Sequence, residues 1–226
     1  MNSNRREWLI AAGLIALALI PSLAGGMRIG EIAADAPVTA ENARFLQMPL
    51  PVVLHIVGAL VYSLIGAFQF LPGFRGRHVT WHRFAGRYLL VPAGLVVAFS
   101  GLWMTAFYDA PPIDGLALQI SRYVVGVGMA ASIVLALIAV ARRDIAHHGA
   151  WMIRAYALAM GAGTQVLTSA PFAILFGTPS EFRRLVQMDA GWLINIVVAE
   201  IIIRRTLLRP RPLPSLAASA AIASHE

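Results

Sequence analysis

The sequence predicts an all-α membrane protein, a bundle of six transmembrane helices with both termini in the cytoplasm. Its hydrophobic content is 58% and its charged content only 13%, whereas soluble proteins are about 45–50% apolar and about 25% charged. The apolar residues form six blocks, each close to or above the roughly 20 residues that cross a hydrocarbon core of about 30 Å. Arginines gather in alternate loops between these blocks, which indicates the orientation.

The six blocks are separated by short loops, so we expect a single transmembrane helical domain over residues 1–205. No block is interrupted by a Gly/Pro pair of the kind that discontinuous helices require, which gives little support to a small transporter. Residues 206–226 are rich in Pro, Ala and Ser and are expected to be a disordered cytoplasmic tail. The expected spans are 8–27, 51–71, 86–107, 118–141, 151–176 and 185–203.

The first block admits a second interpretation, a cleaved signal peptide. A basic start precedes an apolar run that ends in small residues at 24–26. The apolar run is longer than the usual core of a signal peptide, which favours a retained span. Either interpretation leaves the other five spans in the same orientation.

The orientation follows from the basic residues, all 18 of which are arginine. With the N-terminus in the cytoplasm, 13 arginines fall on the cytoplasmic side and 5 on the outer side, as the positive-inside rule requires. We therefore expect a multi-pass protein of the bacterial inner membrane whose arginines contact lipid headgroups rather than nucleic acid. The outer arginines are Arg28, Arg44, Arg122, Arg183 and Arg184.

Two spans carry polar residues along one helix face. The second span places His55, Gly58, Tyr62, Gly66 and Gln69 on a common face, and the fifth span does the same with Arg154, Gly161, Gln165 and Thr168. His55 and Gln165 lie at comparable depth near the outer side, which makes a hydrogen bond between them possible. The stripes are open to two interpretations, helix packing with satisfied polar groups or a polar cavity that opens outward.

Two basic loops at the cytoplasmic edge hold four of the six histidines. One interpretation is haem b held between His82 and His148, with arginines such as Arg87 and Arg154 at the propionates. A second is a metal site of His78, His82 and His148, although histidine-box enzymes use about twice as many histidines. A third is that these histidines bind lipid phosphate or cap helices. The loop residues are Arg75, Arg77, His78, His82, Arg83 and Arg87, then Arg142, Arg143, Asp144, His147 and His148.

The segments around these loops resemble the DUF2306 family of bacterial predicted membrane proteins over roughly residues 50–170. The resemblance rests on His55-x-x-Gly58, His82-Arg83-x-x-Gly86-Arg87 and His148-x-x-Trp151-Met152-Ile153-Arg154. It implies that His55, His82, His148, Arg87, Trp151, Met152 and Arg154 occupy family motif positions, and it favours His148 over His147. It implies no reaction. The bundle is also distantly similar to b-type transmembrane cytochromes, but His55 has no histidine partner across the membrane.

The best specific hypothesis from the sequence is a haem- or metal-linked membrane redox role at a cytoplasmic-edge site of His82 and His148. His55, Arg87 and Arg154 are further candidate cofactor-binding residues. The alternative is a non-enzymatic accessory or structural subunit of a larger membrane complex. Cysteine is absent, which excludes thiolate metal sites, and neither a phosphate loop nor a nucleophile elbow is present. Glu200 is expected to pair with one of the inner arginines.

Overall fold

The computed structural model describes residues 3–207 and is helical apart from short connections over that range. Six helical stretches are long and apolar enough to cross a membrane, which confirms the all-α, six-span prediction. The elements are α1 (Ser3–Ala33), α2 (Ala43–Gln47), α3 (Pro49–Gln69), α4 (Pro72–Arg77), α5 (Val79–Ala85), the π-helical turn η1 (Gly86–Leu90), α6 (Val91–Phe107), α7 (Leu116–Ala141), α8 (Ile145–Ala159), α9 (Gly161–Phe176) and α10 (Glu181–Thr206).

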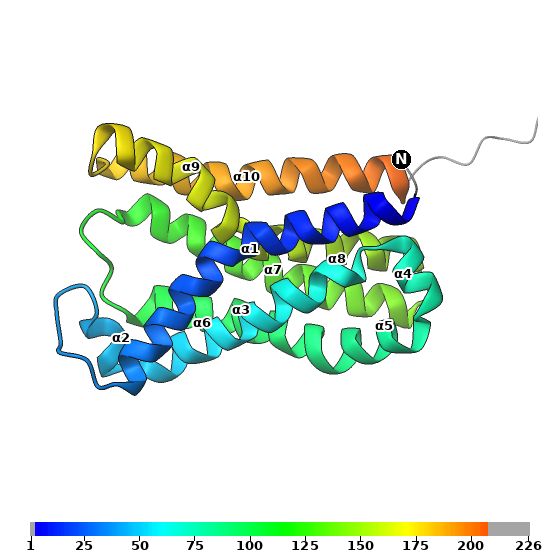
Figure 1. The fold of residues 1–226 in the computed structure, drawn as a ribbon, viewed down its shortest axis with the longest axis horizontal. Coiled ribbons are helices and arrows are strands. Elements are labelled where there is room, and N and C mark those ends of the chain that lie inside the picture. The colour runs from blue at the N-terminus through cyan, green and yellow to red at the C-terminus, as the bar shows by residue number, and fades with distance from the viewer. Residues whose placement is uncertain (1–2, 208–226) are drawn as a thin grey trace, which may run out of the picture.

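The spans lie side by side along one long axis (Figure 1). α3 packs on α6, α6 on α7 and α7 on α8, while α10 packs on α8 and α9, and α1 on α3 and α9. One end of the bundle carries the N-terminus, α4 and the turn between α7 and α8, and we call it the N-terminal end. The opposite end carries α2 and is called the α2 end. The expected tail over 206–226 lies almost wholly outside the described residues.

The helices extend beyond most of the apolar blocks that predicted them. The third span, expected from residue 86, already begins at Val79 and passes through the π-helical turn into α6. The first span likewise continues to Ala33 rather than stopping at residue 27. An apolar run marks only the part of a helix within hydrocarbon, and the helix continues into the headgroup region, where charged side chains are tolerated.

The fifth span is broken near its middle, which its single apolar block did not indicate. α8 ends at Ala159, Met160 forms a turn, and α9 begins at Gly161. A backbone break inside a membrane leaves polar groups that need partners. Asn195 of α10 forms one hydrogen bond on each side of the break. Its Nδ2 donates to Ala157 O (3.0 Å), and its Oδ1 accepts from Thr164 Oγ1 (2.8 Å). α8 therefore stays on α7, while α9 follows α10.

Glycines allow α9 its close contacts with the neighbouring helices. A Cβ at Gly161 would collide with the Trp192 ring, and one at Gly163 would collide with the backbone carbonyl of Leu17 in α1. A Cβ at Gly191 of α10 would lie 2.6 Å from the Gln165 side chain. Packing on α10 and α1 therefore holds α9 in its position after the break.

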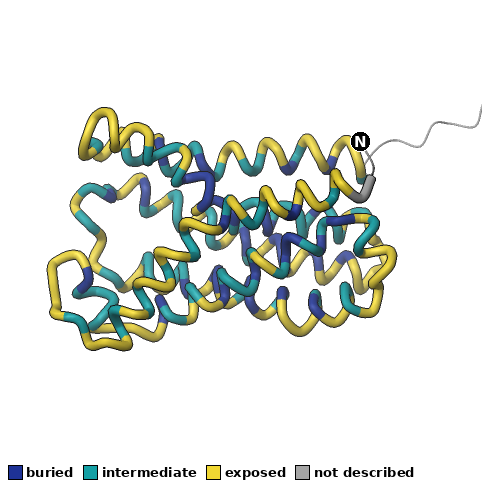
Figure 2. Tube along the Cα trace, viewed as in Figure 1, coloured by how far each residue is buried: buried dark blue, intermediate teal, exposed yellow. Residues whose placement is uncertain are grey.

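The core lies between α3, α6, α7 and α8 and includes Tyr62, Ile133 and Tyr156. Buried residues occupy the facing sides of the helices, and exposed residues occupy the outer sides (Figure 2). The exposed sides are rich in large apolar side chains such as Leu23 and Ile174, as expected for contact with lipid. On α3, Gly58, Tyr62, Gly66 and Gln69 are all buried, so the predicted polar stripe does face the bundle.

We expect Gly94→Ala to destabilise the protein. Its Cβ would lie 2.6 Å from Tyr62 Cε2 and 2.8 Å from Ile133 Cδ1, and such overpacking costs about 1–3 kcal/mol. Thermal unfolding of the detergent-solubilised protein measures the loss. Gly26→Ala is the control, because a Cβ added at this position of α1 would meet no atom of a neighbouring helix within 4 Å. Equal stability of the two variants would contradict this packing.

Candidate functional site

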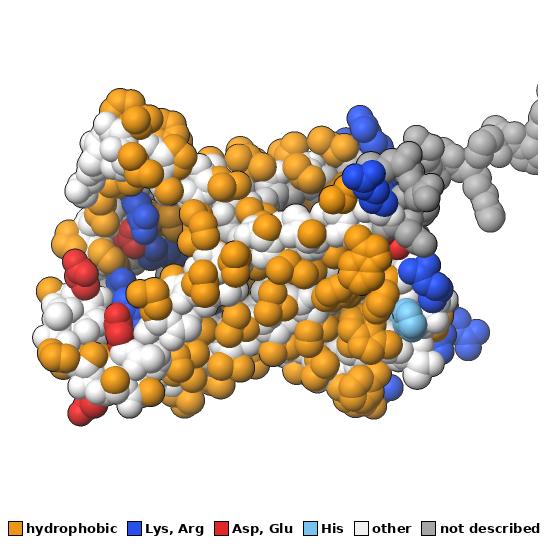
Figure 3. Space-filling model, in the orientation of Figure 1, with side chains coloured by type: hydrophobic (Ala, Val, Ile, Leu, Met, Phe, Trp, Pro, Cys, Tyr) orange, Lys and Arg blue, Asp and Glu red, His pale blue; other side chains and the backbone are white. Residues whose placement is uncertain are grey.

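A cavity of about 400 Å³ opens at the α2 end, between α6 and α7 on one side and α9 and α10 on the other. Its size falls in the range of small-molecule sites. The space-filling view shows the hollow, with blue and red side chains inside it (Figure 3). The wall is largely apolar, with Val97, Ala98, Met104, Met129 and Leu158 among its residues.

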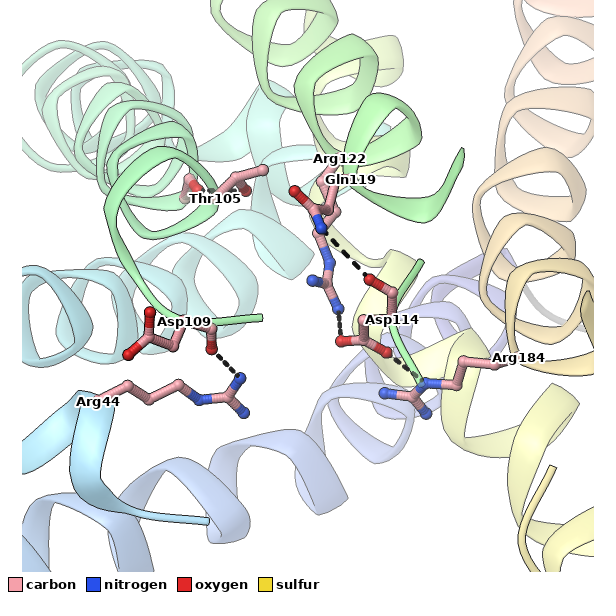
Figure 4. Close-up of polar contacts among 8 residues, drawn as sticks. Arg44, Thr105, Asp109, Asp114, Gln119, Arg122 and Arg184 are labelled. Atoms are coloured by element: carbon pink, nitrogen blue, oxygen red, sulfur yellow. Dashed lines mark hydrogen bonds and ion pairs between the residues drawn. The ribbon is translucent and has the colours of Figure 1, made fainter. Parts of the chain in front are cut away.

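A buried carboxylate organises the polar part of the cavity. Asp114 lies just before α7 and is 3% exposed. It accepts hydrogen bonds from Arg122 Nη2 of α7 (2.5 Å) and from Arg184 Nε of α10 (3.0 Å), as Figure 4 shows. Burial raises the pKa of Asp114, but the hydrogen bonds and charges of the two arginines outweigh burial and lower it below its usual range. Asp114 is therefore ionised and holds both guanidinium groups at the cavity.

A third guanidinium, that of Arg44 in α2, enters the same space (Figure 4). Its Nη1 donates to the backbone carbonyl of Asp109 (3.2 Å), and the group lies 4.6 Å from the centre of the Phe45 ring. Its Nε is buried and has no hydrogen-bond partner in the described part of the chain. Burial lowers the pKa of Arg44, Asp114 opposes this shift, and neighbouring arginines add to it. Arg44 is thus a partly desolvated cation without a carboxylate of its own.

His55 and Gln165 both line this cavity, but the hydrogen bond expected between them is absent. His55 Nδ1 bonds to Val97 O and Ser100 Oγ, both at 3.1 Å, and Gln165 Nε2 donates to Met188 O (3.1 Å). The helix break directs Gln165 toward α10, which explains the difference. Because a carbonyl only accepts, the bond to Val97 places the proton on Nδ1 and leaves His55 Nε2 as an acceptor.

The histidine cluster lies at the N-terminal end, as the sequence indicated. His148 Nδ1 bonds to Ala136 O (3.0 Å), and His148 lies close enough to His82 for the two to interact electrostatically. His82 Nδ1 is buried without a partner among the described residues. The His78 ring packs on Phe74 at 4.7 Å. Across residues 3–207, no three His, Cys, Asp or Glu side chains are grouped so as to hold a metal ion.

Other residues of this end have internal partners. Arg154 makes two hydrogen bonds to Glu200, Nε–Oε1 at 2.6 Å and Nη2–Oε2 at 3.1 Å, which agrees with the expected pairing of Glu200. Asp144 caps α8 by accepting from His147 N (3.1 Å), and its Oδ2 lies 2.7 Å from His147 Nδ1. The backbone hydrogen bond from His147, together with the contact to its ring, lowers the pKa of Asp144. Arg87 lies 5.7 Å from the centre of the Tyr88 ring.

The comparisons with known proteins identify the family. The DUF2306 family, described as predicted membrane protein, matches residues 52–203, more than half of the chain. The chain belongs to this family. No curated protein and no solved structure matches it. The DUF2306 segment includes Asp114, Arg122 and Arg184, whereas Arg44 precedes it.

The arginine cluster was not recognised from the sequence. Arg44, Arg122 and Arg184 come from α2, α7 and α10, which are far apart along the chain. One signal was present, however. These three are among the five arginines placed on the side of the membrane where the positive-inside rule expects few.

We expect Asp114→Asn to lower the free energy of unfolding at neutral pH by about 1–3 kcal/mol, because two partly exposed arginines lose the charged acceptor that they share. Asp109→Asn is the matched control, since Asp109 is exposed and contributes its backbone carbonyl to Arg44. Thermal unfolding of both variants in detergent measures the difference. Equal melting temperatures would contradict the bridging role of Asp114.

The same ion pairs predict an acid dependence of stability. Because the pKa of Asp114 is lowered in the folded protein, its stabilisation is complete above the unfolded pKa of about 3.9. It is lost as the pH falls through the lower folded-state pKa. The difference in melting temperature between the native chain and Asp114→Asn should therefore stay constant from pH 7 to about pH 4 and become smaller between about pH 4 and pH 3. A constant difference over this range would contradict the assignment.

Proposed function

We propose that this protein binds an organic anion with an apolar portion in the cavity at the α2 end. The observation that carries the proposal is the meeting of three arginines at one apolar-walled cavity, where a single buried carboxylate bridges two of them. A carboxylate or phosphate group accepts from several guanidinium donors at once. The apolar wall and the rings of Phe45, Tyr108 and Trp192 would hold the remainder of the molecule.

The charges of the cavity favour an anion. Its lining residues include three arginines but only two carboxylates, Asp109 and Asp114. Arg44 uses one of its donors on a backbone carbonyl, which does not neutralise its charge. An anion that accepts from Arg44 would replace the hydration that this group has lost on burial, at a depth where electrostatic interactions are strong.

The orientation of the chain determines from where the anion comes. The arginine distribution supports an N-terminal end in the cytoplasm of a bacterial cell. The cavity then opens on the outer side of the inner membrane. The ligand would enter from that aqueous side or from the outer leaflet, and the shared chemistry is an anionic group attached to an apolar body.

We expect Arg44→Gln to weaken the binding of decanoate about tenfold, the loss of roughly 1.4 kcal/mol from one charged hydrogen bond. Arg44 is chosen because it forms no ion pair with any residue between 3 and 207. Isothermal titration of the purified chain in a neutral detergent gives the dissociation constants, and decanol serves as the uncharged probe. Lysophosphatidic acid in place of decanoate distinguishes a lipid phosphate from a free carboxylate.

Arg183→Gln is the matched control for this measurement. Arg183 neighbours the cavity residue Arg184, but it is exposed and donates to Thr178 O away from the lining. Its substitution should leave decanoate binding unchanged. Equal affinity for decanoate and decanol, or equal weakening by both substitutions, would overturn the proposal.

A second candidate is a haem- or metal-linked redox role at the N-terminal end. It is favoured by His148, whose Nδ1 bond to Ala136 O leaves Nε2 for a metal, as in many metal-bound histidines. His82, with its unpartnered Nδ1, would supply the second imidazole. Since Arg154 is paired with Glu200, haem propionates would instead meet Arg87 or Arg83.

For this candidate, protein purified after haem-supplemented expression should show a Soret absorption band. His82→Ala and His148→Ala should each abolish the band, because each removes one axial ligand. His147→Ala should retain it, because His147 bonds to Asp144 instead. Absence of both a Soret band and a copurifying metal would exclude the redox role.

A further inference from the structure

A second, smaller cavity lies near the middle of α1 and α3. Its volume is about 170 Å³, and its walls come from α1, α3, α6 and the break between α8 and α9. His55, Val97, Ala159 and Ala162 line both cavities, so these residues form the partition between them. No Asp, Glu or Arg is among the described residues that line the smaller cavity. This lining suits a neutral molecule better than a charged one.

Tyr62 is a lining residue of this cavity whose hydroxyl has no hydrogen-bond partner within residues 3–207. It is only 2% exposed. The neighbouring Tyr156, whose ring centre is 5.8 Å away, donates its hydroxyl to Ser63 O (2.7 Å). An unsatisfied hydroxyl at membrane depth is costly, because no bulk water reaches it. The hydroxyl itself is not open to a molecule the size of water, so a small shift of the ring brings this unpartnered donor to an occupant of the adjoining cavity.

His55 offers the complementary group. Its Nδ1 is engaged by Val97 O, so Nε2 is the acceptor nitrogen. The cavity wall thus has a phenol donor and an imidazole acceptor seven residues apart on the inward face of α3, which corresponds to about 10 Å of helix rise. The other lining residues are mostly apolar, apart from the hydroxyls of Ser22 and Ser63.

The volume limits the size of the occupant. An apolar protein cavity of roughly 150 Å³ accommodates a benzene ring, so this cavity holds one six-membered ring with small substituents. The wall on the outside of the bundle is α1, which packs on α3 and α9. A hydrophobic tail attached to the ring would leave beside α1 into the bilayer.

We propose that this cavity binds the ring of a neutral, lipid-soluble compound with carbonyl or hydroxyl oxygens, the chemistry of a quinone or quinol headgroup. Tyr62 donates to an oxygen of the ring in either form. His55 Nε2 accepts only from a hydroxyl, so the quinol gains a hydrogen bond that the quinone lacks. This site is independent of the anion proposed for the larger cavity.

The test uses the full chain in a nonionic detergent, with 2,3-dimethoxy-5-methyl-1,4-benzoquinone and its quinol as probes. Equilibrium dialysis should show saturable binding of both, tighter for the quinol. Tyr62→Phe should weaken both about tenfold, the effect of one hydrogen bond. Tyr156→Phe is the matched control, since it removes an equivalent hydroxyl that already has a partner. It should lower the melting temperature without changing affinity for the probes.

A second variant keeps the test valid if Tyr62→Phe does not fold. Ala59 lines only the smaller cavity, so Ala59→Leu should fill it and abolish probe binding while decanoate binding is retained. That retention also separates failure of this proposal from failure of the anion proposal. Absence of saturable binding to the native chain, or equal binding by Tyr62→Phe, would overturn the proposal. A third result would also overturn it: no binding of either probe to the native chain, together with a lower melting temperature of ligand-free Tyr62→Phe. That result would indicate that Tyr62 binds a water molecule.

Discussion

One side chain, Asn195, joins the two halves of the broken fifth span, and the cavities depend on it. In an unbroken helix the carbonyl of Ala157 would accept from Gly161 N. Asn195 supplies a donor to this carbonyl and an acceptor to the hydroxyl of Thr164. Without this pair of bonds the Ala157 carbonyl would lose its partner in hydrocarbon, so Asn195 acts together with the close packing of α9 on α10 and α1.

The break acts on electrostatics as well as on shape. When α9 follows α10, the start of α10 stays beside the loop that precedes α7, and Arg184 reaches Asp114. Asp114 then holds Arg122 and Arg184 together, whereas Arg44 brings a third charge from α2 without a carboxylate partner. The cavity is therefore positively charged by arginines from α2, α7 and α10. The hydrogen bonds between Asp114 and two of these arginines are already formed in the ligand-free protein, which lowers the cost of ordering the site.

The sequence predicted those features that depend on one segment at a time. Apolar length located the six spans, and residue spacing placed Tyr62 and Gln69 on the inward face of α3. The break was missed because it depends on contacts between helices, with Trp192, Leu17 and Asn195 acting on a segment that reads as one apolar run. The arginine cavity was missed for the same reason. The hydrogen bond that comparable depth made possible between His55 and Gln165 is not formed, because depth alone does not fix the rotation of a broken helix.

The proposed site at the α2 end is distinguished by a partly buried cation. At the N-terminal end Arg154 has Glu200 and His147 has Asp144, while the buried Nδ1 of His82 has no partner among the described residues. At the α2 end Arg122 and Arg184 share Asp114, while Arg44 has no ion pair and its buried Nε has no partner among the described residues. Packing alone would not retain a desolvated, partly unsatisfied cation, because its burial is unfavourable. A ligand that accepts a hydrogen bond from Arg44 would offset the unfavourable burial of its guanidinium group.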